Sequence, residues 1–144
     1  MRKIKFRAWL EDEDIPTGYM VEPAMNMFIN FFGEMCIGNF QDKIVKYKPE
    51  QYILMQYTGL HDRKGKEIYE GDIFVVRTLH DGDEYIWNQE RFNFGGTGAI
   101  PQVVTWDIEL LGFRFGLSTR IKYAPYDFEV IGNIYENKEL LEAK

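Results

Sequence analysis

The chain has 144 residues, of which 45% are hydrophobic and 16% are aromatic. This length is enough for one domain with a core, and the apolar content excludes an intrinsically disordered chain. The formal net charge of −6 at pH 7 argues against a surface that follows nucleic-acid phosphates, although a local basic patch stays open.

The single cysteine, Cys36, excludes an intramolecular disulfide, the usual staple of small secreted domains. The basic N-terminal stretch is interrupted by charge at every second position and has no apolar segment after it, so it is not expected to be a signal peptide. No uninterrupted apolar run approaches the roughly 20 residues that span a bilayer. We therefore expect a cytoplasmic protein without membrane contact.

Residues 3–9 alternate strictly between apolar and basic, which predicts a half-buried strand. Ile4 and Phe6 are expected on the inner face, and Lys5 and Arg7 on the outer face. The acidic run 11–14 and the residues Pro16 and Gly18 after it are typical of a loop.

The aromatic segment 25–40 is interrupted by two glycines, which favours two short strands around a turn over one helix. Residues 43–48 form a further strand candidate, ended by Pro49. The stretch 52–79 then predicts a β-hairpin unit. Gly65 and Gly71 stand where its two reversals need a positive φ, which glycine adopts at least cost.

Residues 80–98 are polar and glycine-rich and are predicted to form a long loop, with 84–88 as an extra strand. Strand patterns return at 102–106, 111–115, 120–123 and 128–132. Residues 137–144 predict a short C-terminal helix, with Asn137 as its N-cap candidate.

Three segments in order, Ile4-Lys-Phe-Arg-Ala-Trp9, residues 55–74 and Glu129-Val-Ile-Gly-Asn-Ile-Tyr-Glu-Asn137, resemble the YopX family of phage and prophage proteins. Lys138 stands where the family often has proline, and residues 10–48 and 80–100 match poorly. The resemblance implies an all-β fold with a small barrel-like, SH3-like core and an origin in a phage or prophage. It implies no catalytic residue, because the family has none defined.

The expected fold class is therefore mostly β, with an N-terminal β extension and a short C-terminal helix. We expect a single domain over residues 1–144. Its N-terminal β region covers about 1–50, its central β core about 51–136 and its helix about 137–144.

Metal and cofactor chemistry has little support in the sequence. His61 and His80 are the only histidines and Cys36 is alone, so no clustered ligand spacing exists, and no metal or cofactor is expected. Met35 and Ile37 flank Cys36, which predicts a buried and inert thiol. No set of acid, base and nucleophile is visible, so we expect no enzymatic activity.

Two groups of residues are candidates for binding. The first is Trp87, Arg91, Phe92 and Phe94, which could stack on bases or contact a protein, with packing against the barrel edge as the alternative. The second is Met25, Met27, Phe28 and Phe31, which could form an interface with a partner or a second copy, with core burial as the alternative.

These observations favour a non-enzymatic β module that works by binding an unknown protein partner. A single-stranded nucleic-acid-binding protein is the first alternative, which the acidic charge disfavours. A small enzyme, such as a hydrolase, is the second.

Overall fold

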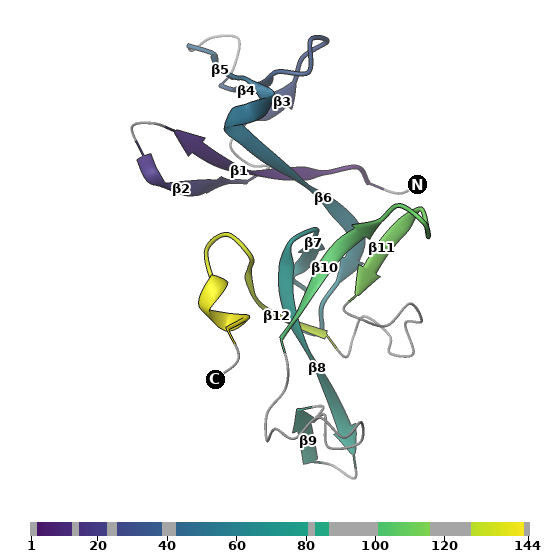
Figure 1. Ribbon diagram of the computed structural model, residues 1–144. Helices are drawn as coiled ribbons and strands as arrows, with labels where there is room; N and C mark the ends of the chain where they lie inside the picture. The colour runs from purple at the N-terminus through teal and green to yellow at the C-terminus, as the bar shows by residue number, and fades with distance from the viewer. Residues whose placement is uncertain are drawn as a thin grey trace. The chain divides into compact units, whose positions relative to one another are not determined.

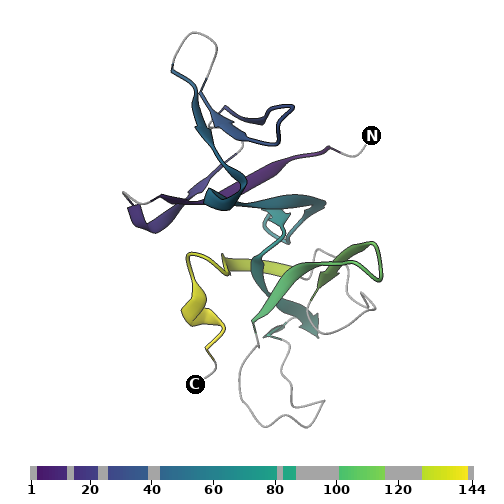
Figure 2. The same ribbon diagram turned by 45° about the horizontal axis from the view of Figure 1, so that its top comes forward.

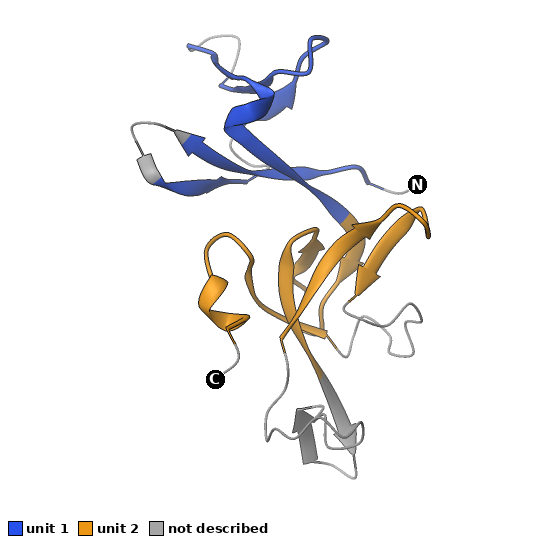
Figure 3. Cartoon of the chain, viewed as in Figure 1, with its two compact units in different colours: residues 1–57 blue, residues 58–144 orange. Residues whose placement is uncertain are grey.

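The computed structural model of the chain describes residues 3–12, 15–22, 26–38, 43–80, 83–86, 101–115 and 128–142 (Figure 1). The fold is mostly β and contains a curled half-barrel sheet, as predicted. The chain divides into two compact units, residues 1–57 and 58–144 (Figure 3). The boundary lies inside the long strand β6 (Tyr52–His61).

In unit 1, β1 (Phe6–Asp12) pairs antiparallel with β2 (Ile15–Val21) on one side and with the first half of β6 on the other. The buried side chains of β1 pack with those of neighbouring strands in one cluster: Ala8, Leu10, Val21 and Met35. Arg7, predicted on an exposed face, is only 5% exposed. Both faces of β1 are therefore covered, because Trp9 is also buried on the side of Arg7.

The strand β2 replaces the loop that Pro16 and Gly18 predicted. Proline lacks a backbone N–H, but β2 is the outer strand of its ladder, where one side needs no donor. Gly18 has φ +63°, and the Trp9 indole lies directly against its Cα. The glycine is thus present for a close side-chain approach within a strand.

Gly18→Ala is expected to destabilise the protein by about 2–4 kcal/mol, because strain at positive φ adds to overpacking. A Cβ at this position would come within 2.6 Å of Trp9 Cε2. Urea unfolding measures the loss, and tryptophan fluorescence of the folded variant reports displacement of the indole. Gly33→Ala is the matched control: Gly33 also has a positive φ, but nothing lies within 4 Å of the added Cβ. An equal effect of both substitutions would contradict the role of the indole.

Unit 1 also holds a small antiparallel sheet in the order β3 (Met27–Ile29), β4 (Met35–Ile37), β5 (Val45–Tyr47). The two short strands predicted in 25–40 and the strand predicted in 43–48 are confirmed. A single 3-10 turn, Pro49–Gln51, then leads into β6. Cys36 on β4 is buried, as predicted.

In unit 2, the second half of β6 is followed by β7 (Glu67–Tyr69) and β8 (Asp72–His80). The main sheet has the order β11-β10-β8-β12, and β9 (Asp83–Ile86) also pairs with β8. The remaining strands are β10 (Gln102–Asp107), β11 (Gly112–Phe115) and β12 (Phe128–Asn133). Figure 2 shows the hairpin of β10 and β11 in green from a second direction.

The core of unit 2 is built on three phenylalanines from three strands. The Phe74 ring lies 4.7 Å from that of Phe128 and 5.9 Å from that of Phe115, between centroids. Ile68 and Val104 are fully buried in the same cluster. These contacts join strands that are far apart in sequence and hold the curled sheet together.

The predicted turn after β6 is organised by the buried carboxylate of Asp62. Its Oδ1 accepts hydrogen bonds from the backbone N–H of Lys64 at 2.8 Å and of Lys66 at 2.9 Å. Its Oδ2 accepts from the backbone N–H of Val130 on β12 at 3.0 Å. Gly65 has φ +80°, as the turn prediction required. One carboxylate thus shapes the turn and ties it to a distant strand.

At the second predicted reversal, both the N–H and the carbonyl of Gly71 are hydrogen-bonded to other parts of unit 2. Gly71 has φ +78°, its N–H donates to the Val104 carbonyl at 2.8 Å, and its carbonyl accepts from the Ile134 N–H at 2.9 Å. Asp72 Oδ2 accepts from the Tyr69 N–H at 2.8 Å, so this carboxylate bonds to the backbone of its own turn.

The predicted C-terminal helix is not confirmed: in the described part of that segment, residues 137–142, the chain forms a 3-10 turn, Lys138–Leu140. Asn137 makes no side-chain cap there. Its Oδ1 instead accepts from the Asn133 N–H at 3.2 Å and lies against Gly132, so the residue stabilises the preceding turn. The predicted strand 120–123 and most of the predicted loop 80–98 lie outside the described residues. None of the helices in the described part of the chain has the length and apolar character that crossing a bilayer needs.

Candidate binding surfaces

The turn between β3 and β4 carries two exposed aromatic side chains, Phe31 and Phe32, which we call the β3–β4 tip. Phe31 is fully exposed, and Phe32 is 87% exposed. The Asn30 side chain orders the turn, since its Oδ1 accepts from the N–H of Phe32 at 2.9 Å and of Glu34 at 3.0 Å. The Asn30 Nδ2 donates to Glu34 Oε2 at 2.6 Å.

A tyrosine on β6 fastens the same turn from outside. The Tyr52 hydroxyl donates to the Gly33 carbonyl at 2.7 Å. Burial raises the pKa of the Tyr52 phenol, and the nearby Cys36 thiol adds to the rise. The phenol therefore keeps its proton and remains a donor at neutral pH. The two phenylalanines are thus presented by a well-bonded turn.

The turn between β10 and β11 carries a second exposed apolar group, Ile108, Leu110 and Leu111, which we call the β10–β11 tip. Ile108 is 74% exposed, Leu110 52% and Leu111 73%. Asp107 orders this turn, because its Oδ1 accepts from the N–H of Glu109 at 2.9 Å and of Leu110 at 3.0 Å. Leu111 has φ +48°, a conformation that branched and bulky residues rarely adopt.

The base of the β10–β11 tip is also fixed. Trp106 and Phe113 face each other across the two strands, with ring centroids 5.1 Å apart in an edge-to-face arrangement. Arg114 Nη1 lies 3.4 Å from Asp107 Oδ2. Trp106 is still partly exposed, so the aromatic pair extends the apolar surface of the tip down the hairpin.

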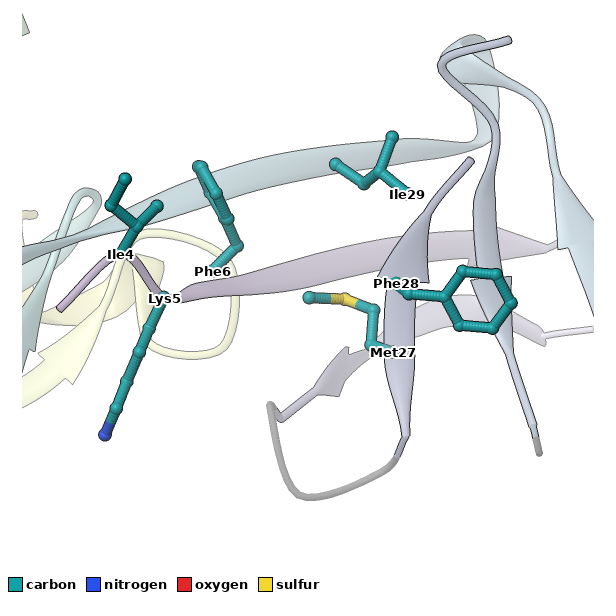
Figure 4. A pocket seen from close by; sticks show the side chains of 6 residues that line it. All are labelled: Ile4, Lys5, Phe6, Met27, Phe28 and Ile29. Carbon is teal, nitrogen blue, oxygen red and sulfur yellow. The ribbon is translucent and has the colours of Figure 1, made fainter. Parts of the chain in front are cut away.

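Unit 1 has a pocket of about 230 Å³ lined by residues of β3, of the start of β1 and of the segment that leads into β1: Ile4, Lys5, Phe6, Met27, Phe28 and Ile29. Figure 4 shows Met27 and Ile29 pointing to the β1 side of β3, whereas Phe28 points the other way. Lys5 likewise points away from Ile4 and Phe6, and its Nζ lies 5.5 Å from the centroid of the Tyr57 ring. The side chains that point into the pocket are therefore apolar.

The predicted interface residues fall into different environments. Phe31 is in the β3–β4 tip, and Phe28 is partly exposed on β3. Met27 is half-buried, packs against the core of unit 1 and lines the pocket. Met25 and all four predicted aromatic-site residues, Trp87, Arg91, Phe92 and Phe94, lie outside the described residues.

Sequence reasoning missed the β10–β11 tip. The run Asp107-Ile-Glu-Leu-Leu-Gly112 joins two strands and should have been polar for a solvent-exposed turn. Its three aliphatic residues were the available signal, but a short apolar run between strands is equally typical of a buried connection.

The described part of the chain holds no cluster of three or more His, Cys, Asp or Glu side chains arranged to bind a metal. Cys36 Sγ lies 3.7 Å from the Glu34 carbonyl and is buried in the small sheet. His61 is exposed at the end of β6. Cys36 therefore packs inside the small sheet, whereas His61 faces solvent.

The candidate surfaces of the described residues are thus the β3–β4 tip and the pocket in unit 1 and, separately, the β10–β11 tip in unit 2. The chain belongs to the YopX protein family, whose family model matches residues 5–142. The crystal structure of protein EF1440 from Enterococcus faecalis has a similar fold, with a TM-score of 0.59 and 23% sequence identity, and the match covers 99% of this chain and 100% of that one. The search of curated proteins found no match.

Proposed function

We propose that this protein is a non-enzymatic binding module that recognises a protein partner through its apolar hairpin tips. The observation that carries the proposal is the exposure of large apolar side chains on turns that are themselves well ordered by hydrogen bonds. An apolar surface on a rigid turn costs solubility, and such surfaces on soluble proteins commonly mark contact sites.

The charges around the β10–β11 tip favour a protein partner over nucleic acid. Glu109 is exposed within this tip, and Asp107 borders it. Carboxylates repel phosphate, so a backbone-tracking mode is disfavoured there. The partly exposed Trp106 is the feature that would support stacking on bases, which makes single-stranded nucleic acid the alternative to be tested.

Two further parts of the proposal rest on sequence rather than on the tips. The family resemblance supports an origin in a phage or an integrated prophage. A single buried cysteine supports a reducing compartment, the cytoplasm of the cell that expresses the protein.

We expect replacement of either tip to remove binding without loss of stability. The variants are Phe31→Ser with Phe32→Ser for the first tip, and Ile108→Ser with Leu111→Asn for the second, since asparagine tolerates positive φ. Affinity capture from host cells, infected or induced, followed by mass spectrometry, identifies proteins that the wild type retains and a tip variant loses. Ile53→Thr, which removes an exposed apolar residue from a strand, is the matched control.

Thermal melting accompanies each capture experiment. Unchanged capture by one tip variant would exclude that tip from the contact, and unchanged capture by both would refute the proposal. A fluorescence response of Trp106 to single-stranded DNA or RNA at low salt, lost on Trp106→Ala, would favour the nucleic-acid alternative instead.

A further inference from the structure

The small sheet of unit 1 ends at the outer edge of β3, and its hydrogen-bond pattern shows which backbone groups face outward there. The Asn30 N–H donates to the Glu34 carbonyl at 3.0 Å, and the Gly38 N–H donates to the Asn26 carbonyl at 3.3 Å. Bonded and non-bonded pairs alternate along an antiparallel ladder. Phe28 therefore bonds toward β4, whereas the N–H and C=O of Met27 and Ile29 point away from β4.

These outward groups lie beside the apolar pocket, because Met27 and Ile29 both line it. Within the described residues, β3 pairs only with β4, so no described strand occupies this side. A row of backbone donors and acceptors at a sheet edge is a template for another strand.

The opposite wall of the pocket is also an extended segment of chain. The Tyr57 N–H donates to the Lys5 carbonyl at 2.9 Å, so by the same alternation Phe6 turns its backbone groups to the side of β2. Described pairing with β2 begins only at Ala8, opposite Val21. The pocket thus lies between two extended segments and has apolar side chains from both.

The size of the pocket discriminates between ligands. Sites for drug-sized molecules and cofactors enclose about 300–1,000 Å³. The volume here, about 230 Å³, is smaller and suits one or two apolar side chains. Specific side-chain pockets beside an open strand edge characterise recognition by strand addition.

We propose that an extended segment of a protein partner adds to β3 as the outer strand of this sheet and places an apolar side chain in the pocket between Phe6 and Met27. The inference rests on one part of the proposed function, that the protein is a binding module for a protein partner, and deepens it by naming a binding mode. Backbone hydrogen bonds to Met27 and Ile29 supply affinity, and the pocket selects an apolar residue at alternate positions of the segment.

The test uses a defined probe. A library of random linear decapeptides is panned on the full chain, and the most enriched peptide is synthesised with a fluorescent label. Its affinity is measured by anisotropy for the wild type, Ile29→Ala and Ile29→Pro. Proline removes only an N–H that faces away from β4, so the β3–β4 ladder keeps its bonds. Thermal melting checks that both variants fold.

We expect Ile29→Pro to weaken peptide binding by about tenfold more than Ile29→Ala, the effect of losing one interfacial backbone hydrogen bond. Single N-methylation within the part of the peptide that pairs with β3 should weaken binding at every second residue, because alternate amides face β3. This scan does not depend on the folding of any protein variant.

Equal binding to Ile29→Ala and Ile29→Pro, an N-methyl scan without a period of two, or failure to enrich any binding peptide would each overturn strand addition. If any of these results is found and the tip variants also lose partner capture, strand addition is wrong and the proposed function is retained. The opposite result is also distinguishable. If peptide binding depends on β3 but the tip variants still capture every partner, the role of the tips is refuted and the strand-addition site is retained.

Discussion

Asp62→Ala is expected to lower the free energy of unfolding by about 3–5 kcal/mol. The buried carboxylate accepts hydrogen bonds from the N–H of Lys64, Lys66 and Val130. The Val130 N–H is buried, so removal of its acceptor leaves a polar group without water. We expect the turn after β6 to lose its attachment to strand β12. Urea unfolding, monitored by circular dichroism, measures the loss of stability.

The comparison with Asp62→Asn sharpens this prediction. An asparagine keeps one acceptor oxygen. It places an NH₂ group, which cannot accept a hydrogen bond, where the second carboxylate oxygen of Asp62 lies. It should therefore recover only part of the lost stability. Asp107→Ala is the matched control, because Asp107 orders its turn with the same kind of bonds to exposed N–H groups, which water can replace. Comparable losses for Asp62→Ala and Asp107→Ala would contradict the importance of burial.

Gly71→Val is the second substitution with a large expected effect, a loss of about 3 kcal/mol or more. A β-branched residue is poorly tolerated at φ +78°, and Gly71 cannot move to another conformation without breaking its bonds to Val104 and Ile134. The thermal midpoint of the variant should fall clearly, as recorded by differential scanning calorimetry.

Gly65→Val separates backbone strain from these tertiary bonds. Gly65 has nearly the same φ, +80°, but is exposed and has nothing within 4 Å of an added Cβ. Its substitution should cost about 1–3 kcal/mol from strain alone. A Gly71→Val midpoint equal to that of the wild type would show that this reversal is not held as the structure indicates.

Much of the fold is readable from local sequence because the responsible physics is local. The strands in 25–40 follow from apolar runs interrupted by glycine, and the reversals at Gly65 and Gly71 follow from conformations that glycine adopts at least cost. The resemblance to the YopX family added the expectation of a barrel-like core. The burial of Cys36 followed from its apolar neighbours.

Other features were decided only by contacts between distant residues. Strand β2 tolerates Pro16 because it is the outer strand of its sheet. It contains Gly18 because the Trp9 indole occupies the space that a side chain would need there. Arg7 is buried although its alternation pattern placed it outside. Asn137 is a helix-cap candidate by sequence, yet its side-chain Oδ1 accepts from the Asn133 N–H.

The candidate surfaces divide in the same way. The sequence by itself determined the β class, the glycine turns and the apolar character of the segment that contains Phe28 and Phe31, since each depends on residue type and spacing. Only the tertiary structure decided that Phe31 projects while Met27 packs inward, and that the β10–β11 tip is exposed. An apolar side chain has no intrinsic preference between core and interface, because both remove it from water; its place depends on which surfaces the rest of the chain has already covered.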